Sequence, residues 1–337
     1  MSTDTIPVGL KRIPLFADLD ENKLREYLQL LQPVSFYQGD CLMTQGEVAD
    51  SIFFLEEGAV DVVTTLPGDS EMVITTLGPG SVIGEMALLD DIGTRTATVR
   101  ALTPTNGFLI ERQDCRTLLT QAHEMTFTVQ HRITLSLCQR LRELFTTILN
   151  FSLPFLTSEV SGELDSSFNT LRHSSTSLAY KAFLPQLPFF SNFRSDDIDH
   201  LLTQAAVLEL SHEQVLFRQG NPGRASFIII RGAVELVSNT EQQYPLGVLG
   251  PGHICGQLAL IDNSPHEATA VVRSRTVLLE LSQPVFKHLF TANTRTAAKF
   301  QHAIMQSLLT ALAKADNHLT RLMSQSALRT RRSKTVS

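Results

Sequence analysis

The sequence predicts a mainly β protein with flanking helices, built from two tandem antiparallel barrels or rolls. Three observations predict this fold class. Short runs rich in Val, Ile, Phe and Thr alternate with glycines roughly every eight to twelve residues, a spacing typical of antiparallel barrels and rolls. The whole pattern occurs twice along the chain. Each copy ends in a long helical stretch that carries a regular apolar stripe.

An internal repeat relates the two copies. Gly58-Ala59-Val60 recurs as Gly232-Ala233-Val234 at an offset of 174 residues (232 − 58), and Gly78-Pro79-Gly80 recurs as Gly250-Pro251-Gly252 at an offset of 172 (250 − 78). The offset changes through small deletions in loops, where such changes are tolerated. A repeat this long indicates two tandem domains rather than a solenoid.

The elements of the first copy follow in order. A leading helix is predicted over residues 20–31, where Leu24, Leu28 and Leu31 fall on one face. Strands are predicted at Ser51–Leu55, Val60–Thr65 and Met72–Leu77. The segment Pro67-Gly68-Asp69-Ser70 has the composition of a hairpin turn between the last two.

A long helix is predicted to close the first copy, from Met125 to Leu149. Apolar residues recur along it at steps of three and four residues: Val129, Ile133, Leu137, Leu141, Leu144 and Ile148. Such a stripe packs a helix onto its own roll. The same surface could pair with a partner helix in another state, so the sequence leaves a homodimer through the long helices open.

The composition changes between the two copies. Serines gather in this stretch, at Ser158, Ser161, Ser166, Ser167, Ser174, Ser175 and Ser177, which is typical of a flexible linker. The predicted organisation is a first domain at 1–150, a linker at 151–183, a second domain at 184–330 and a basic tail at 331–337. We expect the tail, with Arg331, Arg332 and Lys334, to be solvated and disordered.

Charge and cysteine usage exclude several classes of protein. The 337 residues carry a net charge of −6, which argues against general affinity for nucleic acid. Four scattered cysteines, with no Cys-x-x-Cys pair, are typical of reduced thiols. The first residues lack the basic and then apolar run of a signal peptide, and no window of about 18 apolar residues occurs. We expect a cytoplasmic protein with no membrane span.

One segment has the residues of a site for a phosphorylated sugar. Gly84 lets the backbone approach a ligand closely, and residues 86–88 can begin a helical turn whose free N–H groups face a phosphate. Arg95 supplies a planar cation that can grip a phosphate through two hydrogen bonds. Glu85 repels a phosphate but can accept a hydrogen bond from a sugar hydroxyl.

This segment resembles the phosphate-binding cassette of the cyclic nucleotide-binding domain family, which includes regulatory subunits of cyclic AMP-dependent kinase and catabolite-activator regulators. The matching residues are Gly84-Glu85-Met86-Ala87-Leu88 and Arg95-Thr96-Ala97-Thr98-Val99. The resemblance implies that Glu85 holds the ribose 2′-hydroxyl, and that Arg95 and the amides of Met86, Ala87 and Leu88 hold the cyclic phosphate. It also implies an eight-stranded, jelly-roll-like β-roll over about 13–150 and 187–325.

The sequence does not decide which base is bound. By the match to bacterial members of the family, Ile74 and Thr75 line the base pocket. Thr96 follows the arginine at a position where similar domains that prefer cyclic GMP often carry threonine. The bacterial-like spacing of the cassette favours cyclic AMP. Cyclic AMP is therefore expected as the ligand, with cyclic GMP as the alternative.

The second copy has a degenerate cassette. Gln257 replaces the acid and His266 replaces the arginine. A neutral imidazole cannot match a guanidinium fork, and losing that contact to phosphate costs on the order of 2–5 kcal/mol. We expect the second domain to keep the fold and to have lost ordinary cyclic nucleotide binding.

These features predict a non-enzymatic sensor that binds a cyclic mononucleotide in its first domain and passes a conformational change to a protein partner. A ligand-independent scaffold of two rolls, or a receptor for a cyclic dinucleotide, is the alternative. A metal enzyme is not expected, because the histidines show no His-x-His pair. Only one helical stretch, Thr291–Leu328, follows the second roll, so we expect no helix-turn-helix and no direct DNA binding.

Overall fold

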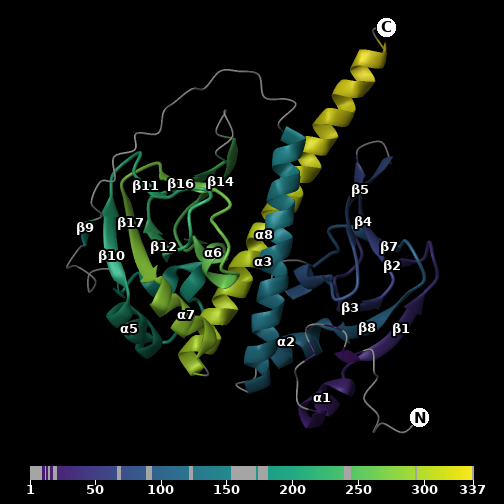
Figure 1. Cartoon of the computed structure of the whole chain (residues 1–337), viewed down its shortest axis with the longest axis horizontal. Coiled ribbons are helices and arrows are strands. Elements are labelled where there is room, and N and C mark those ends of the chain that lie inside the picture. The colour runs from purple at the N-terminus through teal and green to yellow at the C-terminus, as the bar shows by residue number, and fades with distance from the viewer. Residues whose placement is uncertain are drawn as a thin grey trace. The chain divides into compact units, whose positions relative to one another are not determined.

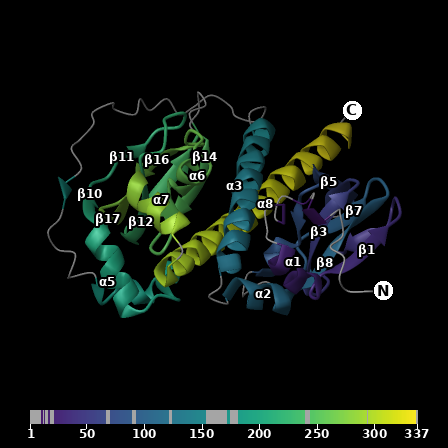
Figure 2. The ribbon, with the colours of Figure 1, turned by 60° about the horizontal axis from the view of Figure 1, so that its bottom comes forward.

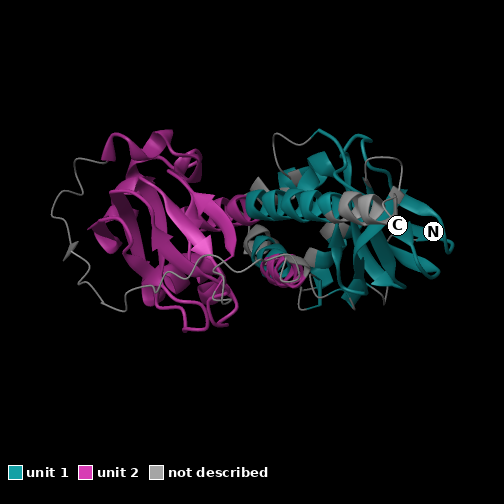
Figure 3. Cartoon of the chain, turned by 90° about the horizontal axis from the view of Figure 1, so that it is seen from above, with its two compact units in different colours: residues 1–137, 309–337 teal, residues 138–308 magenta. Residues whose placement is uncertain are grey.

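The computed structural model separates into two compact units (Figure 3), residues 1–137 with 309–337 and residues 138–308. It describes residues 10–11, 13, 16–17, 21–66, 70–88, 93–120, 124–152, 172–173, 181–238, 244–292 and 294–335. Each unit contains one β-roll of two antiparallel sheets (Figure 1). The mainly β fold class and the pair of rolls predicted from the sequence are confirmed.

The described residues of the first roll form eight strands. They are β1 (Gln32–Phe36), β2 (Cys41–Met43), β3 (Ser51–Glu57), β4 (Val60–Leu66), β5 (Ser70–Leu77), β6 (Val82–Ile83), β7 (Thr98–Ala101) and β8 (Thr105–Glu111). One sheet has the order β1-β8-β3-β6 and the other β2-β7-β4-β5. The three strands predicted here are confirmed within two residues at each end. The predicted turn at residues 67–69 lies outside the described residues.

The core of the first roll lies between its two sheets. Its buried members are Met43, Phe53, Leu55, Val60, Val62, Ile83 and Val99. Successive side chains of a strand point to opposite faces, so Phe53 and Leu55 of β3 face this core. Phe54 points the other way and meets Phe16 edge-on, with the ring centroids 5.2 Å apart. The strand is therefore covered on both faces, which explains its continuous apolar run.

Helices flank the first roll. The leading helix α1 (Glu21–Leu28) is shorter than predicted, because Pro33 favours extended backbone at the position before it and β1 begins at Gln32. A single 3₁₀ turn, η2 (Glu85–Leu88), follows β6. Helix α2 (Arg112–Thr120) packs against β3 and β8 (Figure 2).

The long helix α3 (Glu124–Ser152) confirms the predicted apolar stripe. Five residues of that stripe are buried, Ile133, Leu137, Leu141, Leu144 and Ile148, and the side chain of the sixth, Val129, lies outside the described residues. Residues 124–137 of this helix belong to the first compact unit and residues 138–152 to the second. Within the described part of the chain, no helix has the length and apolar character needed to cross a bilayer.

The second roll repeats the eight-stranded arrangement. Its strands are β10 (Ala206–Leu210), β11 (Val215–Phe217), β12 (Ala225–Arg231), β13 (Val234–Val237), β14 (Pro245–Leu249), β15 (Ile254–Cys255), β16 (Thr269–Val272) and β17 (Thr276–Ser282). The sheets have the orders β15-β12-β17-β10-β9 and β11-β16-β13-β14. The extra strand β9 (Arg172–His173) pairs with β10. It lies within the region expected to be a linker, most of which is outside the described residues.

Helices also flank the second roll, in the order η4 (Leu184–Gln186), η5 (Pro188–Phe190), α5 (Ser195–Gln204), α6 (Gln257–Ile261), α7 (Gln283–Thr291) and α8 (Arg295–Thr335). An aromatic cluster joins η5, α7 and α8, since Phe300 of α8 meets Phe189 and Phe286 edge-on. The expected disorder at 331–337 is wrong for residues 331–335, which continue α8. Neither glycine nor proline occurs after residue 295 to end the helix.

One glycine contact recurs in both rolls and fixes a tight turn. A Cβ on Gly58 would lie 2.5 Å from the Pro104 carbonyl oxygen and 2.7 Å from Thr105 Oγ1. At Gly232 a Cβ would lie 2.3 Å from Thr276 Oγ1. Both glycines have a φ of +96°, a conformation that favours glycine. The repeat therefore preserves a close approach of two backbone segments.

We expect Gly58→Ala to destabilise the protein by about 2–4 kcal/mol, because a methyl group adds steric overlap to left-handed strain. Gly39→Ala is the matched control, since Gly39 has a φ of +93° and a methyl group there would have no other atom within 4 Å. The control should lose only about 1 kcal/mol. Urea unfolding followed by circular dichroism measures both, and equal losses would contradict the close-approach explanation.

Candidate functional site

The cassette of the first roll begins where β6 ends. Gly84 has a φ of +79°, and a Cβ there would lie 2.7 Å from Arg95 Nη1 and 2.9 Å from Met43 Cε. Only glycine therefore permits this backbone conformation and leaves room for the guanidinium. The 3₁₀ turn η2 follows at once, so the glycine joins the last strand residue to the turn that carries Glu85.

The Arg95 guanidinium is buried and held by the start of β3. Its Nη1 donates a hydrogen bond to the Ser51 carbonyl oxygen at 2.7 Å, and its Nη2 donates to Ser51 Oγ at 2.8 Å. Nη2 also donates to Asp50 Oδ1 at 3.2 Å. The Arg95 side chain is 7% exposed, whereas that of Asp50 is 72% exposed. These contacts fix the plane of the guanidinium.

The backbone of Arg95 is held as well. Its N–H donates to the Glu47 carbonyl oxygen at 2.7 Å, and its own carbonyl accepts from the Gly46 N–H at 2.9 Å. Burial lowers the pKa of Arg95, and the charges of Asp50, Glu47 and Glu85 act in the opposite direction. A guanidinium with these carboxylates around it stays charged at neutral pH. The result is a buried cation of fixed position.

The other predicted site residues differ in their environment. Glu85 is 2% exposed, and Met86 and Ala87 are also buried. The Ala87 N–H donates to the Gly84 carbonyl oxygen at 2.9 Å, so this amide closes the 3₁₀ turn. Thr96 is exposed. The side chain of Leu88 lies outside the described residues.

Ile74 and Thr75, predicted to line the base pocket, lie on β5 at the edge of the sheet β2-β7-β4-β5. Both are half-buried, and Ile74 packs against the core between the sheets. The structure thus places Gly84, Glu85 and Arg95 around one turn, and places Ile74 and Thr75 on a separate strand of the same roll.

Sequence reasoning missed the two residues that hold Arg95. Asp50 and Ser51 align at the repeat offset of 174 with Arg224 and Ala225 in the second copy. The alignment is supported by matching contacts, since the Arg112 N–H donates to the Asp50 carbonyl and the Gln283 N–H to the Arg224 carbonyl. The acid therefore changes to a base in the copy that lacks the cassette arginine. Comparing the two copies position by position could have found this signal.

The cassette of the second roll keeps the left-handed glycine and a short helix directly after it. Gly256 has a φ of +80°, and α6 begins directly after it with Gln257, which is buried. The His266 N–H donates to the Asn221 carbonyl oxygen, and the His266 carbonyl accepts from the Gly220 N–H, both at 2.9 Å. These bonds match the backbone bonds of Arg95, so the two cassettes share this pair of backbone hydrogen bonds.

The side chain at the arginine position is packed against an aromatic ring. The His266 imidazole stacks on Phe217 with ring centroids 3.9 Å apart and an interplanar angle of 14°. Phe217 aligns with Met43 at the offset of 174. Burial, together with the charge of Arg142, lowers the pKa of His266 to about 4. The imidazole is therefore neutral at pH 7, as the sequence comparison assumed.

This burial predicts a pH dependence of stability. A histidine with a pKa near 6.5 when unfolded and about 4 when folded stabilises the fold fully above pH 6.5 and progressively less as the pH falls toward 4. Between pH 7 and 4.5, wild type should lose about 2–3 kcal/mol more unfolding free energy than His266→Gln. Urea unfolding at the two pH values measures this, and equal losses in both proteins would contradict a buried neutral imidazole.

Comparison with known proteins gives the family. The sequence model of the cyclic nucleotide-binding domain matches residues 33–122 and 207–293. The chain is similar to the regulatory domain of Toxoplasma gondii PKA with cAMP, at 19% identity over 92% of this chain and 95% of that chain, with a TM-score of 0.32. It is similar to the regulatory subunit of a cAMP-independent protein kinase A from Trypanosoma brucei, at 20% identity over 83% and 81%, with a TM-score of 0.31.

A shorter match covers less than half of this chain. The N-terminal domain of a transcriptional regulator from Streptomyces coelicolor A3(2) is 31% identical over 41% of this chain and 94% of that chain, with a TM-score of 0.33. The family match rests on the two sequence regions, one in each roll, which together make up more than half of the residues. The chain therefore belongs to the cyclic nucleotide-binding domain family and carries two copies of its domain.

Proposed function

We propose that this chain binds one cyclic mononucleotide, in the cassette of its first roll, and passes the resulting conformational change to a protein partner. The observation that carries the proposal is the buried Arg95 guanidinium, held by Ser51 and Asp50 beside Gly84. Because the guanidinium is already held in position, little side-chain entropy is lost when an anion binds, and this favours tight and specific recognition.

The chemistry of the residues suits a cyclic sugar phosphate. A guanidinium has five N–H donors, and the contacts to Ser51 and Asp50 use three of them. The remaining donors suit the phosphate. Glu85 is the first residue of η2 and is buried, and its carboxylate can accept a hydrogen bond from the ribose 2′-hydroxyl. Cyclic AMP is the favoured ligand because of the bacterial-like spacing of the cassette. Cyclic GMP is the alternative, because Thr96 follows Arg95 and is exposed.

The second roll, in this proposal, does not bind an ordinary cyclic nucleotide. His266 is neutral and stacked on Phe217, so the phosphate would meet no guanidinium at this position. The protein would act by binding and not by catalysis, with output through a partner or a second copy bound to the long helices α3 and α8. All four cysteines are free thiols, which supports a reducing compartment such as the cytoplasm.

Titration of cyclic AMP, cyclic GMP and cyclic dinucleotides into wild type and Arg95→Ala tests the proposal. We expect one mononucleotide to bind with micromolar or tighter affinity, and Arg95→Ala to weaken it at least tenfold, about 1.4 kcal/mol, because a charge-assisted contact to phosphate is lost. Calorimetry measures both affinities.

Arg100→Ala is the matched control for this titration. Arg100 lies five residues further on, and its ion pair with Glu71 is on the surface, so its loss should leave nucleotide affinity within about twofold. Absence of binding to wild type would favour the scaffold alternative. Binding of a cyclic dinucleotide alone would favour that receptor class, and an equal loss in both variants would contradict the role of Arg95.

A further inference from the structure

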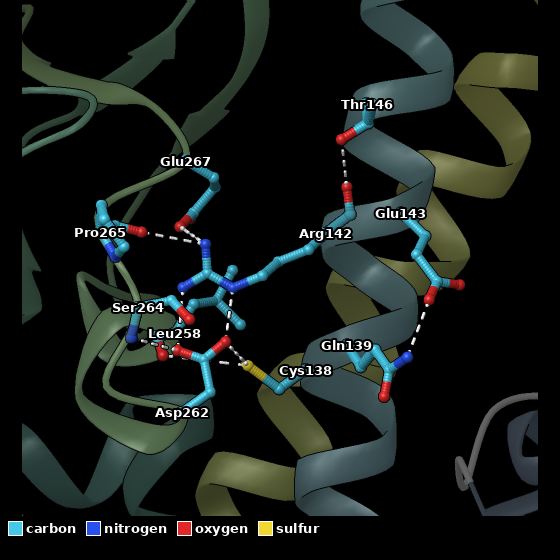
Figure 4. Close-up of polar contacts among 10 residues, drawn as sticks. All are labelled: Cys138, Gln139, Arg142, Glu143, Thr146, Leu258, Asp262, Ser264, Pro265 and Glu267. Atoms are coloured by element: carbon cyan, nitrogen blue, oxygen red, sulfur yellow. Dashed lines mark hydrogen bonds and ion pairs between the residues drawn. The ribbon is translucent and has the colours of Figure 1, made fainter.

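The second cassette holds a cation that does not come from the cassette itself. Arg142 of α3 reaches the loop that follows α6 (Figure 4). Its Nε donates to Asp262 Oδ2 at 2.6 Å and its Nη2 donates to Asp262 Oδ1 at 3.0 Å. This is the bidentate arrangement of a guanidinium on a carboxylate, which is stronger and more specific than a single contact.

Two further groups complete the site around the guanidinium. Arg142 Nη1 donates to the Pro265 carbonyl oxygen at 3.0 Å, and the same nitrogen lies 3.4 Å from Glu267 Oε2 (Figure 4). The side chains of Arg142, Asp262 and Glu267 are all at most 23% exposed. All three nitrogens of the guanidinium therefore have acceptors within one loop of the second roll.

Two positions of this loop differ in charge from the first cassette, whereas Asp262 aligns with the acid Asp90 at the offset of 172. The repeat aligns His266-Glu267 with Arg95-Thr96, so a cation followed by a neutral residue has become a neutral residue followed by an acid. Burial raises the pKa of Glu267, and the charge of Arg142 opposes that rise. Burial alone would raise the pKa of Asp262, but the hydrogen bond from Arg142 lowers it overall. The charge of Arg142 favours the ionised form of both carboxyl groups.

We propose that the degenerate cassette of the second roll is a guanidinium-binding site whose ligand is Arg142, so that this roll is bound to α3 in place of a nucleotide. The site takes a planar cation through Asp262, Glu267 and the Pro265 carbonyl oxygen. This inference does not depend on nucleotide binding by the first roll, because all of its atoms belong to residues 138–308.

The native cysteines provide a direct test on the full chain. Cys138 is buried four residues before Arg142, and its thiol donates weakly to the Leu258 carbonyl oxygen and to Asp262. Burial raises the pKa of Cys138 to about 12. Cys255 is buried in the core of the second roll. Cys138 therefore reports release of α3 from the roll, and Cys255 reports unfolding of the roll itself.

The experiment measures the rate of N-ethylmaleimide labelling at each cysteine by peptide mass spectrometry. In Arg142→Ala, Cys138 should be labelled at least tenfold faster than in wild type while Cys255 is unchanged. Loss of the Arg142 charge would by itself raise the pKa of Cys138 further and slow its reaction, so faster labelling reports exposure. Arg142→Lys keeps the positive charge but lacks the planar guanidinium. The labelling rate at Cys138 should therefore rise less in this variant than in Arg142→Ala.

Gln139→Ala is the matched control on the same helix, because Gln139 is exposed and bonds only within α3, to Glu143 (Figure 4). It should leave labelling at Cys138 within twofold of wild type. Labelling of Cys138 within twofold in Arg142→Ala would overturn the proposal. So would equal acceleration at Cys138 and Cys255 in both Arg142 variants, since this would show a general loss of structure.

Amide hydrogen exchange of α3 peptides within 138–152 supplies a second readout that does not depend on thiol chemistry. Asp262→Asn should speed exchange in these peptides at least fivefold. If the two residues bind each other, the double variant Arg142→Ala/Asp262→Asn should exchange no faster than the faster single variant. Multiplication of the two single effects in the double variant would contradict direct binding.

Discussion

The protein depends on one buried cation whose position is fixed before any ligand arrives. Arg95 is held by backbone bonds to Glu47 and Gly46 and by side-chain bonds to Ser51 and Asp50. A buried charge is tolerated only when it is paired and hydrogen-bonded, and this pairing leaves the guanidinium charged. The left-handed glycine at the end of β6 supplies the space. Together these constraints turn a common β-roll into a candidate anion site.

In the cassette of the second roll, a neutral side chain stands at the position of Arg95, and the two backbone hydrogen bonds of that position are kept. His266 makes the same two backbone bonds as Arg95, but its ring is neutral and stacks on Phe217. The acid that holds Arg95, Asp50, aligns with Arg224. The carboxylates at Asp262 and Glu267 then bind a guanidinium from α3. The two cassettes thus share a left-handed glycine and two backbone hydrogen bonds, and they differ in which residue supplies the cation.

Much of the fold could be predicted because its signals are local and occur twice. Strand composition, the glycine spacing and the 174-residue offset predicted both rolls, and the apolar stripe predicted α3. The predicted end of α1 was imprecise, and the disorder predicted for residues 331–335 was wrong. In both places the residues that mark the end of a helix are weak or missing. The short strand β9 was missed because two residues carry no periodicity.

The candidate site could be predicted only in part. Gly84, Glu85 and Arg95 follow a recognisable pattern, and their roles stay predictions. Contacts between residues far apart in the sequence leave no local pattern. Ser51 and Asp50 lie more than forty residues before Arg95, and Arg142 lies 120 residues before Asp262. Such pairs follow from how strands and helices pack, which periodicity does not describe.

We propose that the first cassette of this chain binds a cyclic mononucleotide and that the second binds Arg142 in its place. Isothermal titration calorimetry of the full chain with cyclic AMP, and with cyclic GMP in parallel, measures the number of sites directly. We expect one bound mononucleotide per chain with micromolar or tighter affinity. Two equivalents per chain, or binding that persists at full affinity in Arg95→Ala, would contradict it.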